Sequence, residues 1–235
     1  MRTTNGTTGQ ISERNPHSDR LLLVNKPKSW TSFDVVAKLR QILGVRKIGH
    51  AGTLDPMATG LLIICTGQRT KEIAQFMGLE KEYRASVRLG GVTSSYDAET
   101  PVTQVRSTAG ITPEQVQTAL RAFVGTITQI PPMHSAVKVR GRRLYSYARK
   151  GKEVERPARD VEVRSIESVF IQIPDVDFTV TCSKGTYIRS LAHDIGQRLG
   201  CGAYLTALER TRIGPHRLED AWTLDELAKN ANLNV

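Results

Sequence analysis

The stretch GHAGTLDPMATGLLIICTGQRTK, from Gly49 to Lys71, restricts the possible folds of this chain more than any other segment. It begins with a glycine-rich loop that carries a single carboxylate, Asp55, directly before Pro56. The proline ring fixes its own φ and disfavours helical backbone at the preceding residue, so we expect Asp55 on a stiff, extended turn. The apolar run from Leu61 to Cys65 follows and predicts a buried strand. A carboxylate on a rigid loop beside a buried strand suits a reactive acid, although an Asx-turn within the loop explains the local pattern at least as well.

The formal net charge of +10 over 235 residues predicts a polyanionic partner. No apolar segment is long enough to cross a membrane, which favours nucleic acid over a lipid surface. The charge is concentrated between Lys138 and Arg159, where nine Lys and Arg face two Glu and leave a net charge of +7. Tyr145 and Tyr147 lie among these cations, and this mixture is typical of surfaces that bind folded RNA with unstacked bases.

Three cysteines, Cys65, Cys182 and Cys201, are far apart and form no C-x-x-C pair. Neither a disulfide framework nor a zinc site is therefore indicated, and we expect no metal. Residues 1–18 are polar and rich in Thr, Gly, Asn and Ser, which predicts a disordered tail. They lack the apolar core of a signal peptide, so we expect a cytoplasmic protein.

Strands and helices interleave along the chain without a strict βαβ rhythm. Strands are expected at 21–24, 61–65, 83–89, 161–173, 176–182 and 203–213. Helices are expected after Thr31 with Asp34 in the first turn, at 71–77, from Thr112 with Gln115 as its capping partner to Gly125, after Ser183 or Thr186, and after Thr223 with Glu226 as its capping partner. This order favours an α+β fold with a mixed or antiparallel central sheet flanked by helices.

Six stretches, in this order along the chain, resemble motifs of the TruB family of tRNA pseudouridine synthases. They are VNKPKSWTS (24–32), GHAGTLDPMATGLL (49–62), KEY (81–83), PPMHSA (131–136), LYSYAR (144–149) and CSKGTYIR (182–189). The resemblance runs from about residue 21 to about residue 227. It implies the pseudouridine-synthase fold, with a long central sheet and a cleft across one face, as one catalytic domain over 19–235 with a basic thumb at about 131–159. The PUA domain that family members commonly carry at the C-terminus is not expected here.

The resemblance also implies an activity, which is isomerisation of uridine to pseudouridine at position 55 of the TΨC loop of tRNA. The uridine must first be flipped out of the loop. An isomerisation consumes no redox cofactor, so no cofactor is expected. The expected partner is the TΨC stem-loop of tRNA, and we expect a monomer that needs no obligate protein partner.

Three residues are expected to carry the chemistry. The family assigns the essential acid to Asp55, which could attack C1′ of the ribose or remove the 2′ proton, and the sequence leaves both routes open. Arg189 is the expected partner, because a guanidinium lowers the pKa of a carboxylate and can orient it by paired bonds. Tyr83 is expected to stack on the uracil and to take part in the final removal of the C5 proton.

Other residues are expected to bind the substrate. The family places His50 near the flipped nucleotide, Tyr187 and Leu208 as walls of the uracil pocket, and Lys26 as a supporting contact to the loop or to RNA. Plainer readings stay open: a histidine bonded to its own loop for His50, a core leucine for Leu208 and a solvated lysine for Lys26. For Tyr83 the plainer reading is a half-buried strand tyrosine, and for Arg189 it is a phosphate contact or an exposed charge at a helix end. Further RNA contacts are expected from exposed cations: Lys71, Lys138, Arg142, Arg143, Arg149 and Lys150.

Two positions depart from the family pattern. Ser29 stands where glycine is usual, so the turn after Lys28 is expected to differ, and Met57 replaces the commoner leucine, a tolerable change in volume. Two other function classes remain as alternatives. A non-catalytic RNA-binding or tRNA-folding module could keep the same fold, and a hydrolase could use one Asp, although no second positioned carboxylate stands in the matched motifs.

Overall fold

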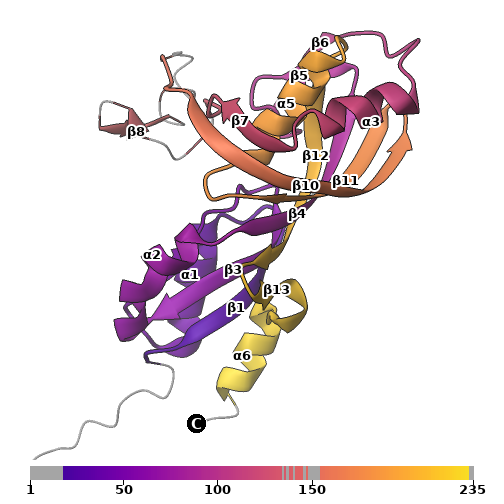
Figure 1. Ribbon diagram of the computed structural model, residues 1–235. Coiled ribbons are helices and arrows are strands. Elements are labelled where there is room, and N and C mark those ends of the chain that lie inside the picture. Colours follow the sequence, from indigo (N-terminus) through magenta and orange to yellow (C-terminus); the bar gives the residue numbers. More distant parts are fainter. Residues whose placement is uncertain are drawn as a thin grey trace, which may run out of the picture.

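The computed structural model describes residues 18–133, 135, 138–139, 141–144, 147 and 154–232, with the backbone alone at 138–139, 142–143 and 231–232. A nine-stranded sheet runs through the molecule (Figure 1). Its order is β1 (Leu21–Lys26), β3 (Thr59–Thr66), β12 (Ala203–Ile213), β4 (Lys81–Leu89), β11 (Asp175–Cys182), β10 (Arg159–Gln172) and β7 (Gly125–Gln129), with β2 (Ile48–Ala51) paired to β3 and β13 (His216–Arg217) paired to β12. The pairing of β12 with β3 is parallel and the other pairings are antiparallel, so the sheet is mixed as expected.

Helices flank both halves of this sheet. The α-helices are α1 (Ser32–Leu43), α2 (Ile73–Gly78), α3 (Pro113–Arg121), α5 (Ile188–Arg198) and α6 (Leu224–Asn232), and two 3-10 helices are η1 (Gly67–Glu72) and η2 (Leu218–Asp220). Figure 1 shows α1 and α2 beside β1 and β3 at one end of the sheet, and α3 and α5 at the other end. Two short hairpins complete the fold: β5 (Gly91–Thr93) with β6 (Val102–Val105), and β8 (Lys138–Val139) with β9 (Arg142–Arg143). The α+β prediction is confirmed.

Three predicted helix starts are confirmed at the level of individual hydrogen bonds. Capping boxes join Thr31 with Asp34, and Thr112 with Gln115. At the start of α6, the Glu226 carboxylate accepts from the backbone N of Thr223, and the backbone N of Glu226 donates to the threonine hydroxyl. Each box satisfies backbone N–H groups that the first turn of a helix leaves unpaired.

Two predicted boundaries are wrong. Helix α3 ends at Arg121, and Gly125 begins strand β7 instead of ending the helix. Helix α5 begins after Tyr187 and has no side-chain cap. The hydroxyl of Ser183 accepts instead from the backbone N of Glu162 in β10, and the hydroxyl of Thr186 donates to the carbonyl of Ser183. Both side chains therefore shape the loop before α5.

The buried apolar side chains form three clusters. Strand β3 is buried on both faces, as its continuous apolar run predicts: Leu62 and Ile64 face α1 and α6, whereas Leu61, Ile63 and Cys65 pack on the opposite side. The inward side chains of β4 pack with β11, β12 and α5 in the largest cluster. The three cysteines are buried free thiols. Within the described ranges, no helix has the length and apolar character to cross a membrane.

The turn at Ser29 keeps a conformation that glycine adopts easily. Ser29 has φ 68°, in the left-handed region, and its backbone N donates to the carbonyl of Pro56 at 2.8 Å. The expectation that this turn differs from a glycine turn therefore finds no support in its backbone angle. The serine accepts some strain, because Cβ crowds the carbonyl in this region, and the turn contacts the Asp55 loop.

Candidate active site

The Asp55 loop lies between β2 and β3 and is attached to Ser32, the first residue of α1, by two hydrogen bonds. The hydroxyl of Ser32 accepts from the backbone N of Leu54 at 2.9 Å and donates to its carbonyl at 3.3 Å. The backbone N of Ala58 donates to the carbonyl of Asp55, which closes the turn that Pro56 begins. The Asp55 side chain makes no such turn of its own, and it reaches an arginine of α5 instead. The Asx-turn reading is therefore wrong.

Lys26 also binds the Asp55 loop, through the carbonyl of Pro56. Its side chain is fully buried, and Nζ donates to the carbonyls of Pro27, Trp30 and Pro56 at 2.9, 2.6 and 3.3 Å. Burial lowers the pKa of Lys26 to about 8, against the attraction of Asp55. Of the two contacts expected for Lys26, the one to the loop is present; a buried ammonium with these partners is not placed to bind RNA.

Arg189 joins two carboxylates. Its Nε lies 2.9 Å from Oδ2 of Asp55, and its Nη1 lies 3.4 Å from Oδ2 of Asp97 and donates to the carbonyl of Ser95 at 3.1 Å. Arg189 and Asp97 are buried, whereas about a third of the Asp55 side chain stays exposed. The guanidinium thus contacts two acids, with Nε toward Asp55 and Nη1 toward Asp97. This arrangement fixes Asp55 while leaving it open to solvent.

The surroundings of Asp55 act on its pKa in opposite directions. Burial raises the pKa of Asp55, and the charge of Asp97 raises it further. Arg189 and Lys26 lower it, but burial is the largest effect and the net direction is upward. Arg189 does lower the pKa of Asp55, as expected, but the desolvation of the carboxylate raises it by more.

Asp55 opens onto a cavity of about 110 Å³ that also contains Tyr83, Tyr187, Arg189 and Leu208. Five of the seven residues proposed from the sequence for chemistry or substrate binding therefore lie together. The cavity is completed by Thr53, Leu54, Ser135, Thr186 and Ile188. It contains an acid, a cation, two aromatic rings and an apolar wall, which is a suitable set for a planar base attached to a sugar.

Tyr187 is held by two residues, Gln129 and Arg159, which flank the segment expected to form the thumb. The backbone N of Tyr187 donates to Oε1 of Gln129, and Nε2 of the same glutamine donates to the carbonyl of Tyr187, at 3.0 and 3.2 Å. The guanidinium carbon of Arg159 lies 4.7 Å from the centre of the tyrosine ring, a cation–π contact. Gln129 ends β7 and Arg159 begins β10, so the two strands fix this wall of the cavity.

His50 does not line the cavity. It lies on β2, opposite Ile64 of β3, and Nδ1 of its ring has no hydrogen-bond partner among the described residues. Burial lowers the pKa of His50, and the nearby charge of Arg210 lowers it further. The imidazole of His50 is thus a partly buried group of β2 and is not among the residues that line the cavity.

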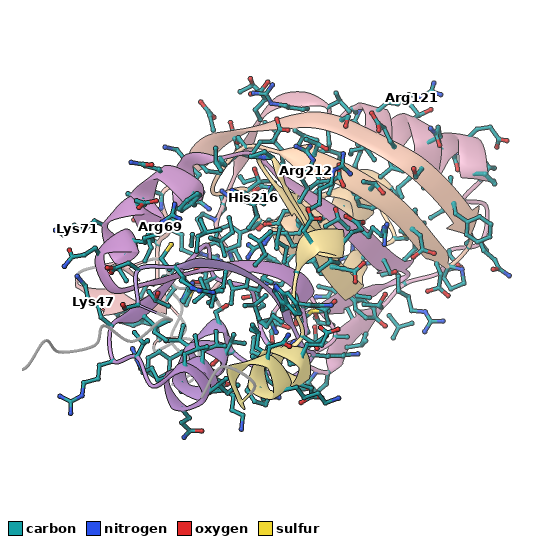
Figure 2. All side chains as sticks on the ribbon, turned by 90° about the horizontal axis from the view of Figure 1, so that it is seen from below. Lys47, Arg69, Lys71, Arg121, Arg212 and His216 are labelled. Atoms are coloured by element: carbon teal, nitrogen blue, oxygen red, sulfur yellow. The ribbon has the colours of Figure 1, made fainter. Side chains whose placement is uncertain are left out.

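The cations expected to bind RNA are only partly described. Lys71 is exposed at the end of η1, and Figure 2 shows it on the same side of the molecule as Lys47 and Arg69, away from Arg121 of α3. For Lys138, Arg142 and Arg143 the backbone forms the β8–β9 hairpin. Their side chains lie outside the described residues, and so do Arg149 and Lys150.

The sequence did not identify four residues that the structure brings to this site. Asp97 and Glu99 come from a polar, turn-rich stretch without helical or strand periodicity. Glu99 accepts from the backbone N of Met57 at 2.9 Å, which ties that stretch to the Asp55 loop. Ser135 is buried in the cavity wall, and its hydroxyl has no hydrogen-bond partner in the described part of the chain. Arg210 is buried behind Tyr83. The one available signal was a pair of acids, two residues apart, in a loop.

No group of His, Cys, Asp and Glu side chains within the described ranges could hold a metal ion. The residues that line the cavity supply a carboxylate, a guanidinium and phenols.

Two family models match the chain. The model described as TruB family pseudouridylate synthase (N terminal domain) matches residues 40–188, and that described as tRNA pseudouridylate synthase B C-terminal domain matches residues 189–234. Proteins named tRNA pseudouridine synthase B are close in sequence. That of Chlorobium luteolum is 50% identical, over 90% of this chain and 75% of the relative. That of Parabacteroides distasonis is 48% identical, over 92% of this chain and 94% of the relative.

Solved structures agree with the fold. The chain matched in a crystal structure of a Cbf5-Nop10-Gar1 complex has a TM-score of 0.70 at 34% identity, over 89% of this chain and 53% of that one. A chain in a structure of an H/ACA RNP bound to a substrate RNA containing 2′-deoxyuridine gives 0.67 at 31% identity, over 89% and 52%. This chain thus spans about half the length of these two structural relatives. The two family models together match residues 40–234, and relatives about 50% identical cover most of the chain, so the chain belongs to the TruB family of pseudouridylate synthases.

Proposed function

We propose that this protein isomerises uridine 55 in the TΨC loop of tRNA to pseudouridine, with Asp55 as the acting carboxylate. The observation that carries the proposal is the placement of Asp55: it is ion-paired with a buried arginine, partly exposed, and at the mouth of a cavity with Tyr83, Tyr187 and Leu208. The family membership makes the protein an isomerase that acts on tRNA. The assignment of the target position rests on the likeness to the family.

The reaction breaks the bond between C1′ and N1, turns the uracil, and joins C5 to C1′. Asp55 either attacks C1′, forming and then losing an ester bond to the sugar, or removes the 2′ proton and later returns it. Both routes need a carboxylate that is ionised and fixed against the ribose. The ion pair with Arg189 favours the ionised form, and the attachment of the loop to Ser32 and Lys26 limits its movement.

After the new carbon–carbon bond forms, C5 carries a proton that must leave. Loss of this proton restores the C5–C6 double bond. Tyr83 is proposed to accept it at the phenol oxygen while its own hydroxyl proton passes through water to N1 of the uracil, so that the number of protons is unchanged. Support comes from the position of Tyr83, which lies in the cavity on β4 and has only 8% of its surface exposed.

The detached uracil must be held while it turns. Tyr187 and Leu208 are proposed as the walls that hold it, because both line the cavity and Tyr187 is fixed by Gln129 and Arg159. Since Asp55 lines the cavity, the uridine is proposed to be flipped out of the RNA so that it can enter. His50 is proposed, on the likeness to the family alone, to contact nucleotides beside the flipped base.

The wider organisation is proposed on the same basis. One catalytic domain spans residues 19–235 after an N-terminal tail, with the basic segment 131–159 as the RNA-binding thumb. The protein is proposed to act as a monomer without an obligate protein partner. The cytoplasm is the proposed location because tRNA is found there.

The proposal is tested by mapping pseudouridine in a tRNA transcript after incubation with the wild type and with Asp55→Ala. We expect one new pseudouridine, at position 55, from the wild type. We expect turnover by Asp55→Ala to fall by at least about a thousandfold, the order seen when an acting nucleophile is removed, while tRNA binding is largely kept. Equal turnover by both proteins would exclude Asp55 as the acting group. Binding without modification by the wild type would support a non-catalytic RNA-binding module instead.

A further inference from the structure

Arg210 is a buried cation without a carboxylate partner. Only 1% of its surface is exposed. No carboxylate of the described residues lies within ion-pair distance of it, although several other arginines of the molecule form such pairs. A buried charge without a counter-charge is costly, and structural arginines are normally paired. The position of Arg210 therefore calls for a role other than a salt bridge.

The donors of Arg210 go to backbone carbonyls around the Asp55 loop. Nε donates to the carbonyl of Leu61 at 2.7 Å, and Nη2 donates to the carbonyl of Gly52 at 2.9 Å. Gly52 precedes Asp55 in the loop, and Leu61 lies in strand β3, which follows it. One guanidinium thus joins the two ends of the loop that carries the acid.

The main chain of Arg210 is equally constrained. In the parallel pairing of β12 with β3 it lies opposite Gly60, whose φ is 99°. A Cβ atom at Gly60 would lie 2.4 Å from the carbonyl oxygen of Arg210, so no larger residue fits. A register shift between Arg210 and Arg212 leaves both Arg210 and Thr211 buried. Such bulges redirect side chains, and they are common beside active sites.

On its other side, Arg210 lies directly opposite Tyr83 in the antiparallel pairing of β12 with β4. Residues opposite each other in a sheet point to the same face. Burial raises the pKa of the Tyr83 phenol, and the positive charge of Arg210 partly offsets that rise. The buried phenol on β4 therefore has a guanidinium as its neighbour on the adjacent strand β12.

We propose that Arg210 is a positioning residue for the isomerisation, which holds the phenol of Tyr83 and the Asp55 loop in one fixed geometry. Its uncompensated charge also favours negative charge at the phenol oxygen while that oxygen accepts the C5 proton. This inference rests on the proposed function, because it assigns to Tyr83 the removal of that proton. Arg210 itself lies behind the phenol and need not touch the substrate.

The test compares Arg210→Lys with Arg212→Lys. Arg212 lies two residues further along β12 and pairs with Glu80 and Glu82 away from the cavity, so its replacement is a matched control. Single-turnover rates are measured with tRNA containing ordinary uridine and with tRNA containing uridine deuterated at C5. Melting temperature and tRNA affinity are measured for each protein.

For Arg210→Lys we expect the rate to fall by about ten- to a hundredfold, the cost of a small misplacement of a reacting group. We also expect a larger isotope effect than in the wild type, since breaking of the C5–H bond becomes more rate-limiting. A purely structural role would lower the melting temperature without changing the isotope effect. Arg212→Lys is expected to match the wild type in rate and isotope effect.

A wild-type rate for Arg210→Lys, or a slower rate with the wild-type isotope effect, would overturn the inference and leave the proposed function intact. A wild type without activity would overturn both. If Arg210→Lys does not fold, Gly52→Ala serves instead, because its Cβ would lie 3.3 Å from Nη1 of Arg210 and would press on the guanidinium while keeping its charge. Since Gly52 has φ 82°, alanine also strains the Asp55 loop, so the isotope effect and not the rate is compared for this variant. The same rise in isotope effect is expected there, and its absence would likewise contradict the inference.

Discussion

Arg189 links Asp55 to Asp97, with its Nε 2.9 Å from one carboxylate and its Nη1 3.4 Å from the other. Asp97 is fully buried and accepts from the Ser95 hydroxyl and the backbone N of Glu99. The inner carboxylate therefore fixes the arginine, and the arginine fixes the outer carboxylate. The two acids bound to Arg189 thus have different roles: Asp97 holds the arginine, and Asp55 lines the cavity.

Replacement of Arg189 by lysine should harm turnover more than binding. Lysine keeps the charge but has a single nitrogen, so it cannot reach Asp55, Asp97 and the Ser95 carbonyl together. We expect the single-turnover rate at saturating enzyme to fall by about a hundredfold or more, with tRNA affinity changed little. A rate equal to that of the wild type would mean that Arg189 does not orient Asp55.

Replacement of Asp97 by asparagine should move the pH dependence of the reaction. Activity requires ionised Asp55, so the rate falls as pH drops through its pKa. The charge of Asp97 raises the pKa of Asp55, and removal of that charge must lower it. We expect the acidic limb of the pH–rate profile to move to lower pH and the maximal rate to fall by about tenfold, as Arg189 becomes less well fixed. A shift of the limb to higher pH would contradict this.

Lys26 should make stability depend on pH in the alkaline range. Its pKa is 10.5 in the unfolded chain and about 8 in the folded protein, because burial disfavours the ammonium. Between these values the unfolded chain binds a proton that the folded protein has released, so the free energy of unfolding rises with pH. At about 1.4 kcal/mol per pKa unit, the rise is at most about 3 kcal/mol.

Lys26→Met removes this rise, and the measurement is urea unfolding at pH 7.5 and pH 10 for both proteins. Lys81 is also buried, and burial lowers its pKa to about 8 as well. It is present in both proteins, so the difference between them isolates Lys26. An identical pH dependence of wild type and variant would show that Lys26 ionises alike in the folded and unfolded states.

Local signals in the sequence were sufficient for much of the fold. Capping boxes at Thr31, Thr112 and Thr223 marked three helices, because a cap depends on residues within one turn. The alternation along β4 and the apolar run of β3 identified these strands by their burial. The order of strands in the sheet, and the parallel pairing of β12 with β3, depend on contacts between distant segments that no periodicity reports.

Most of the site was predictable because it coincided with matched motifs; Leu208 is the one predicted cavity residue outside the six stretches. Asp55, Tyr83 and Arg189 lie within matched stretches, and all three line the cavity. Asp97 lies in a stretch with no periodic pattern, and its role depends on a contact with a helix more than 90 residues away. Arg210 resembles one of several charged residues on a strand until its pairing with Tyr83 and Gly60 is known. Lys26 could not be assigned to the interior, since burial of an ammonium depends on three carbonyls that converge only in the fold.

The last prediction concerns salt and the basic segment 138–159. Neutralising Arg142, Arg143 and Lys150 together should weaken tRNA binding and flatten its dependence on salt. Each lost phosphate contact reduces the slope of log affinity against log salt by about 0.7 to 0.9, because fewer counterions are released on binding. The single-turnover rate at saturation should fall less, since Asp55 and Arg189 are outside the segment.

Neutralising Arg121 and Arg198, two exposed cations of α3 and α5, is the matched control and should leave the slope unchanged. An unchanged slope in the triple variant would exclude the segment as the main RNA contact. The contact would then have to be sought at the exposed cations Lys28, Lys47, Lys71 and Lys184, of which Figure 2 shows Lys47 and Lys71 on one side of the molecule. Lys26 is excluded from that search, because its ammonium is buried against the Asp55 loop and cannot reach a phosphate.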